Sequence, residues 1–246
     1  MENRFKELQD MINECNNIVF FGGAGVSTAS GIPDFRSEQG LYNGKQPYRY
    51  KPEVMLSHSF FLNNTYEFFN FYRDKMCATD YEPNITHKKL AELEEKGKLK
   101  AVITQNIDGL HQKAGSKNVI ELHGTIYRNY CTVCKKEYPV EYVKNNDGIP
   151  KCQYCNLTRA IVRPDVTLYE EQLPVGAMDK AAEYVSKADM LIIAGTSLAV
   201  YPAASLIDSF EGKYLVVINK GKVDRDTFAD LYINGDMTEV FKNLQI

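Results

Sequence analysis

Residues 18–27 read Ile-Val-Phe-Phe-Gly-Gly-Ala-Gly-Val-Ser, an apolar run that breaks into glycines. The pattern predicts a buried parallel strand that turns tightly into a helix start, with backbone N–H groups left free for a phosphate. The dinucleotide fingerprint is incomplete, because Thr28 takes the third place after Gly23 and Gly25. No acidic residue clearly closes a second strand about 20 residues later. Alone, this stretch would favour an ordinary strand-to-helix turn.

Composition limits the class of protein. The 246 residues are 44% hydrophobic, which is enough for one full core and a small satellite domain. There are 29 basic and 32 acidic residues, the net charge is −3, and no long basic run occurs, so nucleic acid is not expected as a partner. The N-terminus lacks an apolar signal core, and no apolar run approaches ~18 residues. We therefore expect a cytoplasmic protein that does not bind membranes.

Further short apolar runs repeat the pattern of the first one. They predict strands over residues 100–104, 119–122, 190–194, 214–218 and 231–234. Helical spacing between them predicts helices over residues 2–16, 86–97 and 177–187, with Thr86 as N-cap and Gly97 as C-terminal stop of the second. The alternation predicts an α/β fold: a Rossmann-like, doubly wound parallel sheet.

Polar residues gather where these predicted strands end. Residues 105–108 follow the second strand, His123 the third, residues 195–197 the fourth and Asn219 the fifth. In an open parallel sheet that edge binds ligands. Arg36, in a loop beside the first glycine turn, is at least as typical of an anion contact as of a solvated charge.

Two segments interrupt the α/β alternation. Residues 40–85 predict a helical module, with one helix from Phe60 to Met76 whose aromatic stripe is more typical of core packing than of a ligand site. Residues 126–159 predict a small inserted domain. The main Rossmann-like domain is then expected over residues 1–125 and 160–246.

Four cysteines in the second insert have the spacing of a metal site. The two Cys-x-x-Cys pairs are Cys131, Cys134, Cys152 and Cys155. Tetrahedral thiolate ligation of Zn²⁺ suits this spacing, and such a small unit could hardly fold without metal. Four thiolates leave no open coordination position, so we predict one structural Zn²⁺. A nucleic-acid-binding ribbon is disfavoured because the basic residues of the insert are offset by acids.

Seven motifs in order resemble those of the sirtuin (Sir2) family of NAD-dependent protein deacylases, in its bacterial form. They read Gly-Ala-Gly-Val-Ser at 23–27, Gly-Ile-Pro-Asp-Phe-Arg at 31–36, Thr-Gln-Asn-Ile-Asp at 104–108, Leu-His at 110–111, Leu-His-Gly at 122–124, the four cysteines, and Gly-Thr-Ser at 195–197. The resemblance covers about residues 5 to 244, and seven motifs in the right order are highly specific.

The resemblance implies a site for NAD⁺ as co-substrate. It implies His123 as general base, Asn106 as organiser of the ribose, and Asp108 as holder of the nicotinamide carboxamide. The residues implied to bind the dinucleotide are Gly23, Ala24, Gly25, Thr28, Phe35, Arg36, Gln105, Ile107, Asp108, Gly195, Thr196, Ser197, Asn219 and Met237. The implied partners are acetylated or acylated lysine peptides, and we expect a monomer.

The chemistry explains these residue types. The nicotinamide ring of NAD⁺ carries a positive charge, and when it leaves as neutral nicotinamide the charge passes to an oxocarbenium-like ribose carbon. A weak nucleophile, the acyl-lysine amide oxygen, can attack that carbon. A ribose hydroxyl must then be activated by a base that titrates near neutrality, which suits histidine. The expected reaction is lysine deacetylation with release of nicotinamide and O-acetyl-ADP-ribose. The alternatives are ADP-ribosyl transfer to protein, a non-catalytic NAD-binding scaffold and, less favoured, a zinc-dependent hydrolase.

The chain departs from the family pattern in the segment implied to line the acyl-lysine tunnel. The family has two valines, an aromatic pair and Gly-Glu after Arg-Pro-Asp, whereas residues 166–171 read Val-Thr-Leu-Tyr-Glu-Glu. Thr167 in the place of valine still offers the main-chain carbonyl that the resemblance implies as acceptor for the lysine N–H. Glu170 in the place of glycine restricts the backbone and adds charge. Arg73 has Asn70 three residues before it, not the tyrosine of succinyl-preferring relatives, so no strong preference for acidic acyl groups is expected.

Overall fold

A computed structural model describes residues 2–35, 37, 40–41, 48–77, 79–221 and 229–246. Its larger sheet has six strands in the order β3-β2-β1-β7-β8-β9, and all neighbours are parallel. The strand bounds are β1 Ile18–Gly22, β2 Leu99–Thr104, β3 Val119–Glu121, β7 Met190–Ala194, β8 Tyr214–Asn219 and β9 Leu231–Asn234. The predicted doubly wound parallel sheet is confirmed.

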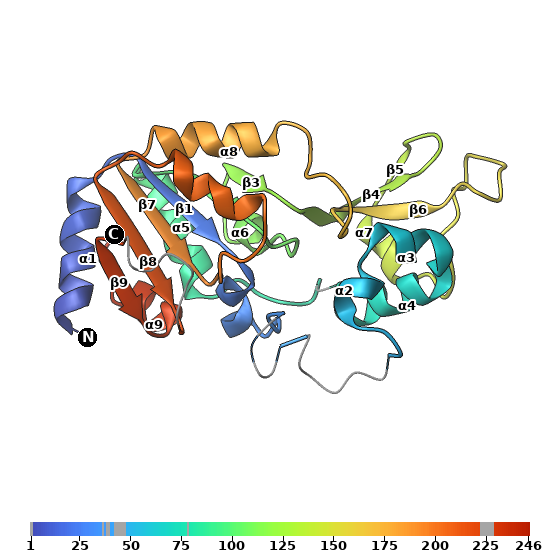
Figure 1. Ribbon diagram of the computed structural model, residues 1–246, viewed down its shortest axis with the longest axis horizontal. Coiled ribbons are helices and arrows are strands. Elements are labelled where there is room, and N and C mark those ends of the chain that lie inside the picture. Colours follow the sequence, from blue (N-terminus) through green and yellow to red (C-terminus); the bar gives the residue numbers. More distant parts are fainter. Residues whose placement is uncertain (1, 36, 38–39, 42–47, 78, 222–228) are drawn as a thin grey trace.

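Both faces of this sheet are covered, which explains why its strands read as apolar runs. Alternate residues of β1 point to opposite faces. Phe20 joins a core with α1 (Glu2–Glu14), α5 (Ile85–Glu95) and α9 (Met237–Lys242), whereas Phe21 joins a core with α8 (Ala177–Ser186) and the 3₁₀ helix η3 (Ala203–Ser209). Figure 1 shows α8 and α1 on different sides of the sheet.

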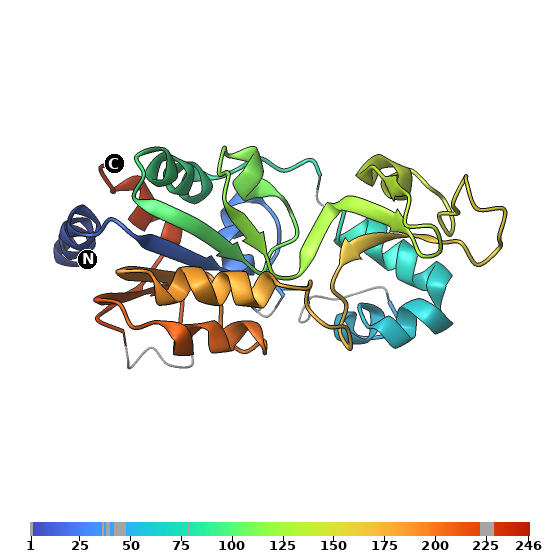
Figure 2. The same cartoon turned by 90° about the horizontal axis from the view of Figure 1, so that it is seen from above.

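The second half of the molecule is built on a smaller antiparallel sheet. Its strand order is β5-β4-β6, with β4 Gly124–Cys131, β5 Glu137–Tyr138 and β6 Val162–Val166. The helix α7 (Val140–Lys144) follows β5 in the chain. Three helices of the predicted helical module pack against it, α2 (Pro52–Met55), α3 (His58–Asn63) and α4 (Thr65–Lys75). Figure 2 shows β4 and β6 side by side where they leave the larger sheet. The proposed domain boundaries stay a prediction.

The aromatic stripe of residues 60–76 is buried in this second core, as core packing requires. Phe68, Phe69 and Phe71 have no exposed surface, and Phe68 makes edge contacts with Phe61 and Phe69. The single helix predicted from Phe60 to Met76 is wrong, because the helix breaks at Asn64. The sequence Asn-Asn-Thr at the break competes with helical hydrogen bonding through its side chains, and Thr65 Oγ1 donates to the Phe61 carbonyl at 2.8 Å.

The start of α5 also differs from the prediction. Asn84, not Thr86, is the N-cap, and its side-chain oxygen accepts from the Thr86 N–H at 2.9 Å. The same amide donates to the Val26 carbonyl at 2.8 Å. The cap therefore ties α5 to the first glycine turn. Among the residues that the structure describes, no helix combines the length and apolar character needed to span a bilayer.

Candidate active site

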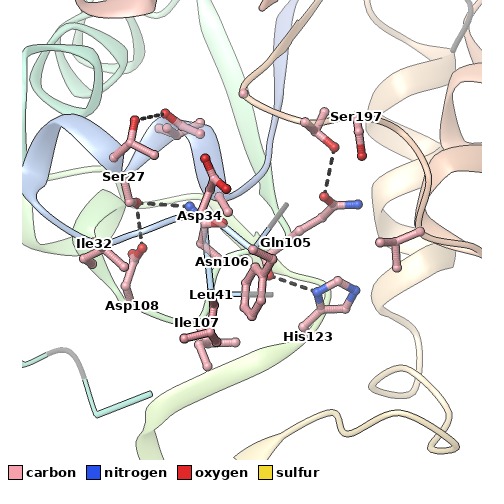
Figure 3. Close-up of a pocket in the computed structure, with 18 of the residues that line it drawn as sticks. Ser27, Ile32, Asp34, Leu41, Gln105, Asn106, Ile107, Asp108, His123 and Ser197 are labelled. Carbon is pink, nitrogen blue, oxygen red and sulfur yellow. Dashed lines mark hydrogen bonds between the residues drawn. The ribbon is translucent and has the colours of Figure 1, made fainter. Parts of the chain in front are cut away.

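A cavity of about 880 Å³ lies at the carboxyl ends of β1, β2, β7 and β8. It extends from the first glycine turn, past His123, to residues 166–173 that follow the smaller sheet. The clustering of polar residues at this edge, expected from the strand ends, is present in the structure. Figure 3 shows Ser27, Gln105, Asn106, Asp108 and His123 around this space.

The two glycine turns pack directly on one another. The Gly25 N–H donates to the Gly195 carbonyl at 2.9 Å, and a Cβ on Gly25 would lie 2.7 Å from Gly195 Cα. Gly23 is equally tight, because its Cβ would lie 2.8 Å from Thr196 Cβ, and it packs behind the cavity wall. Close approach of the backbone is therefore what requires these glycines.

The turn after β1 is not the helix start that its sequence predicts. Two 3₁₀ turns follow instead, η1 (Ala24–Val26) and η2 (Thr28–Ser30). The N–H groups of Gly23, Gly25, Val26 and Ser27 donate to carbonyls of the protein. These four groups are thus engaged internally, which corrects the expectation that the turn leaves them free for a phosphate.

Ser27 links the two polar residues that follow β2. Its hydroxyl donates to Asp108 Oδ2 at 2.6 Å and accepts from Asn106 Nδ2 at 3.1 Å. The other carboxylate oxygen, Asp108 Oδ1, accepts from the Leu110 N–H at 2.9 Å, just after the N-cap Gly109 of α6 (Leu110–Lys113). Burial raises the pKa of Asp108, while the hydrogen bonds from Ser27 and Leu110 oppose that rise.

His123 lies between β3 and β4, where the chain passes from one sheet to the other. Its Nδ1 is 2.9 Å from the Gln105 carbonyl oxygen. A carbonyl can only accept, so Nδ1 carries the proton and Nε2 keeps its lone pair. Burial lowers the pKa of His123, with the Gln105 bond opposing, which favours the neutral imidazole at pH 7. The arrangement suits a general base.

Gln105 carries an unused donor in the cavity wall. Its Oε1 accepts from Thr196 Oγ1 at 3.1 Å, but its Nε2 is buried without a partner among the described protein atoms. A buried amide donor without a partner is costly, so this atom fits a ligand that offers an acceptor. The cavity wall thus fits a bound nucleotide that places an acceptor beside Gln105 Nε2.

The structure brings most predicted dinucleotide residues to one wall and leaves a few aside. Arg36 lies outside the described residues, and Gly23 sits behind the cavity surface. The predicted residues that line the cavity are Ala24, Gly25, Thr28, Phe35, Gln105, Asn106, Ile107, Asp108, His123, Gly195, Thr196, Ser197, Asn219 and Met237.

Sequence analysis missed several residues of this cavity as site residues. Ser27 ends the first glycine motif, residues 23–27, and a hydroxyl beside a glycine turn is the signal that could have identified it as a site residue. Lys220 and Asp236, which line the cavity and form an ion pair at 2.8 Å, gave no comparable signal, because they come from different strand ends.

The four cysteines form a cluster apart from the cavity lining. All four sulfur atoms lie within 4.8 Å of one another, with Cys131 and Cys155 Sγ at 3.8 Å and Cys134 and Cys152 Sγ at 3.7 Å. Four sulfurs around Zn²⁺ at ~2.3 Å stand about 3.8 Å apart at tetrahedral angles. The Val133 and Tyr154 N–H groups point at Cys131 and Cys152 Sγ, which favours thiolates. The cluster thus fits one structural zinc.

Comparisons with known proteins agree on one family. The Sir2 family model matches residues 23–202. The chain is 54% identical over 242 residues to the NAD-dependent protein deacetylase of Clostridium acetobutylicum, covering 98% of each chain. A solved Sir2 structure with a deacetylated p53 peptide and 3'-O-acetyl-ADP-ribose has a TM-score of 0.87 at 40% identity, covering 97% and 96% of the two chains. One with acetylated peptide has a TM-score of 0.83 at 39% identity, covering 97% and 95%.

Proposed function

This chain belongs to the Sir2 family, and we infer from that membership and from the cavity around His123 that it is an NAD⁺-dependent protein-lysine deacetylase. The reaction consumes NAD⁺, acetyl-lysine and water and yields nicotinamide, O-acetyl-ADP-ribose and lysine. The observation that carries the proposal is the neutral His123, with its tautomer fixed by the Gln105 carbonyl, in the wall of a cavity that fits a nucleotide.

We propose that His123 Nε2 removes the proton from a ribose hydroxyl of NAD⁺. Fixed protonation of Nδ1 prevents the ring from presenting the wrong nitrogen, and low basicity keeps the base unprotonated at neutral pH. Once the acetyl-lysine oxygen has displaced nicotinamide from the ribose carbon, the activated hydroxyl can attack the bound acyl carbon. The bond from that carbon to the lysine nitrogen then breaks, so that lysine leaves as the amine, and water adds to the acyl carbon. The acetyl group thereby remains on the ribose.

We propose that Asn106 positions the nicotinamide ribose and that Asp108 holds the nicotinamide carboxamide, each side chain being oriented by its hydrogen bond with Ser27. The Ser27 hydroxyl is hydrogen-bonded to one polar atom of each side chain and so fixes the orientation of both. Their remaining hydrogen-bonding capacity then points in a fixed direction, and no rotation has to be restricted when the ligand binds. The unpartnered Gln105 Nε2 would donate to an acceptor of the nucleotide. The residues around Gly195–Ser197, Asn219 and Met237 are proposed to hold the phosphate and adenosine half.

The proposal includes acylated lysine peptides as partners, a monomeric enzyme without nucleic-acid partners and a cytoplasmic location. It also assigns the four cysteines to one structural Zn²⁺ and not to catalysis, because none of them lines the cavity. Light scattering at micromolar concentration tests the monomer.

The test of function is incubation with NAD⁺ and an acetyl-lysine peptide, with products followed by mass spectrometry beside His123→Ala. We expect free lysine and O-acetyl-ADP-ribose from the native chain, with a fall of about 10²–10⁴-fold in the variant. Peptide mass increased by ADP-ribose would replace the proposal with protein ADP-ribosylation. NAD⁺ binding without turnover of any acyl peptide would leave a binding protein.

A further inference from the structure

One end of the cavity is not needed for the nucleotide. Besides the glycine turns and residues 195–197, the cavity is lined by residues 166–171 and Leu173, a segment that starts beside His123 because the Thr167 N–H donates to the His123 carbonyl at 2.9 Å. A lysine whose acyl group reaches His123 would enter along this segment. This step rests on the proposed function.

Glu170 stands on that entrance in a backbone conformation that favours glycine. Its φ is +74°, in the left-handed region, and its side chain is exposed to solvent. The carboxylate is nevertheless fixed, because Oε2 accepts from the Ser59 N–H at 2.8 Å and Oε1 accepts from Ser59 Oγ at 3.0 Å. Both donors are neutral, so they orient the charge without cancelling it.

The neighbouring carboxylate behaves differently. Glu171 Oε1 and Oε2 accept from the Arg163 guanidinium at 2.6 and 3.0 Å, and Oε1 is 2.7 Å from His58 Nδ1. Hydrogen bonding to Arg163 is among the interactions that hold the pKa of Glu171 below its ordinary value against the effect of burial. The charge of Glu171 is thus neutralised inside the protein.

The remaining described groups leave Glu170 as the uncompensated charge of the entrance. Segments 166–173 and 198–202 contain no lysine or arginine. The two lysines on the described cavity wall are already ion-paired, Lys75 with Asp74 at 3.0 Å and Lys220 with Asp236 at 2.8 Å. No described Lys, Arg or His forms an ion pair with Glu170.

Two exposed tyrosines also line the cavity. Tyr169 is 40% exposed and Tyr201 is 66% exposed. Exposed tyrosine faces attract cations, and guanidinium groups most often. Ring faces and an oriented carboxylate together form a surface complementary to a positively charged peptide.

We propose that Glu170 makes this enzyme select acyl-lysine peptides that carry arginine or lysine next to the modified lysine. A single partly exposed charge pair contributes modestly, so the expected preference over a neutral peptide is about threefold to fivefold in kcat/KM. An acidic neighbour is expected to fall below the neutral one, and salt is expected to reduce both differences.

The experiment uses three acetyl-lysine peptides that differ only in the residues flanking the acetyl-lysine, which are arginine, glutamine or glutamate. The ratio of kcat/KM for the arginine and glutamine peptides is measured at about 50 and about 300 mM NaCl. The Debye length at the lower concentration is longer, and at the higher concentration shorter, than at physiological ionic strength. Because the ratio is taken within one protein, differences in the folded fraction cancel.

The variant Glu170→Gln keeps the size of the side chain and an oxygen that can accept from the Ser59 N–H, its amide N–H can donate to Ser59 Oγ in the reverse direction, and its charge is removed. We expect its ratio to fall to about one, whereas the control Glu67→Gln, an exposed residue of α4 outside the cavity, keeps the native ratio. An unchanged ratio in Glu170→Gln, or a ratio of one in the native enzyme, would overturn the proposal. A ratio lost in Glu170→Gly but kept in Glu170→Gln would assign the effect to the backbone and reject the charge.

Peptide affinity is measured in parallel by isothermal titration with the same three peptides. Loss of turnover with all of them would count against the proposed function alone, because the affinity ratios still report the charge preference. Equal affinities for the arginine and glutamate peptides would reject the role of Glu170 whatever the activity.

Discussion

The two halves of the molecule are stabilised in different ways. The six-stranded sheet is buried on both faces under α1, α5, α8, α9 and η3, and its strands are almost wholly apolar. The smaller sheet has three strands and shares its core with the aromatic residues of α3 and α4. It also contains the cysteine cluster and the buried Arg163–Glu171 pair. The half proposed to bind the nucleotide relies on apolar burial, while the half proposed to meet the peptide adds a cysteine cluster that fits zinc and an internal ion pair.

The largest expected effect is removal of zinc. Apparent binding free energies of small structural zinc sites are about 10–16 kcal/mol, which exceeds what the smaller half can supply otherwise. A strong chelator should therefore unfold residues 126–166 while the parallel sheet stays folded. Hydrogen exchange should show loss of protection in β4 and β6 but not in β1 or β7. Equal protection in the metal-free protein would remove the contrast between the halves.

Breaking the buried ion pair should have the next largest effect. Arg163→Met leaves the half-buried Glu171 carboxylate with the Leu168 N–H and His58 but without its bidentate partner, so we expect the free energy of unfolding to fall by about 3 kcal/mol, the lower end for a buried pair. The double variant Arg163→Met with Glu171→Leu should recover part of this loss, since no charge remains to be buried. Urea unfolding measures both. A loss in the double variant as large as in the single one would contradict this explanation.

Within the nucleotide half, Ser27→Ala tests how much a polar network matters inside an apolar core. It leaves Asp108 Oδ2 and Asn106 Nδ2 without their shared partner, so we expect a loss of about 1–3 kcal/mol in the free energy of unfolding. Deacetylation should also slow. The control Ser186→Ala, on the exposed end of α8, should change neither quantity. Native activity in Ser27→Ala would show that Asn106 and Asp108 need no such support.

The smallest expected effect concerns acid. His87 and His111 contact each other in the sheet core, with ring centroids 4.7 Å apart. Burial lowers the pKa of His87 to about 4 and that of His111 well below its ordinary value. The unfolded chain binds these protons near pH 6.5 and the folded chain does not. Stability is therefore complete above pH 6.5 and falls below it, by up to about 1.4 kcal/mol per pH unit for each histidine.

The variant His111→Leu isolates this contribution. Both ring nitrogens of His111 are buried without hydrogen-bond partners among the described residues. Replacing the ring with leucine should therefore break no hydrogen bond and leave no polar atom unpaired. Between pH 7.5 and 5.5, the free energy of unfolding measured with urea should fall by about 1 kcal/mol less in the variant than in the native chain. His123 and the carboxylates titrate in both proteins and cancel in the comparison. Equal losses would show that His111 is protonated in the fold.

Much of the nucleotide half could be predicted from sequence because its signals are local. Apolar runs identified the strands, and the parallel-edge rule brought Asn106, Asp108 and His123 to one cavity. The cysteine spacing alone identified the metal cluster. Where local preference was misleading, side-chain competition decided, as in the break at Asn64 and the N-cap at Asn84.

The peptide half was less predictable because its contacts join distant segments. The carboxylate of Glu170 meets Ser59 across 111 residues, and Glu171 meets His58 across 113. No periodicity or spacing encodes such pairs. The sequence marked Glu170 as unusual for the family, but only the structure shows where its charge is held.

The connection between the halves has a further consequence. Gly124 pairs with Val166, and the Thr167 N–H donates to the His123 carbonyl at 2.9 Å, so the outgoing and returning chains form one two-stranded stem. The stem is closed so tightly that a Cβ on Gly124 would lie 2.0 Å from the Asp165 carbonyl oxygen. Residues 124–166 could therefore be exchanged for those of a relative at this single stem, whereas α2–α4, which join the chain between η2 and α5, would have to be exchanged separately. The residues proposed to bind the nucleotide, at the carboxyl ends of β1, β2, β7 and β8, would keep their neighbours, so substrate preference could change in evolution without a change in the proposed nucleotide site.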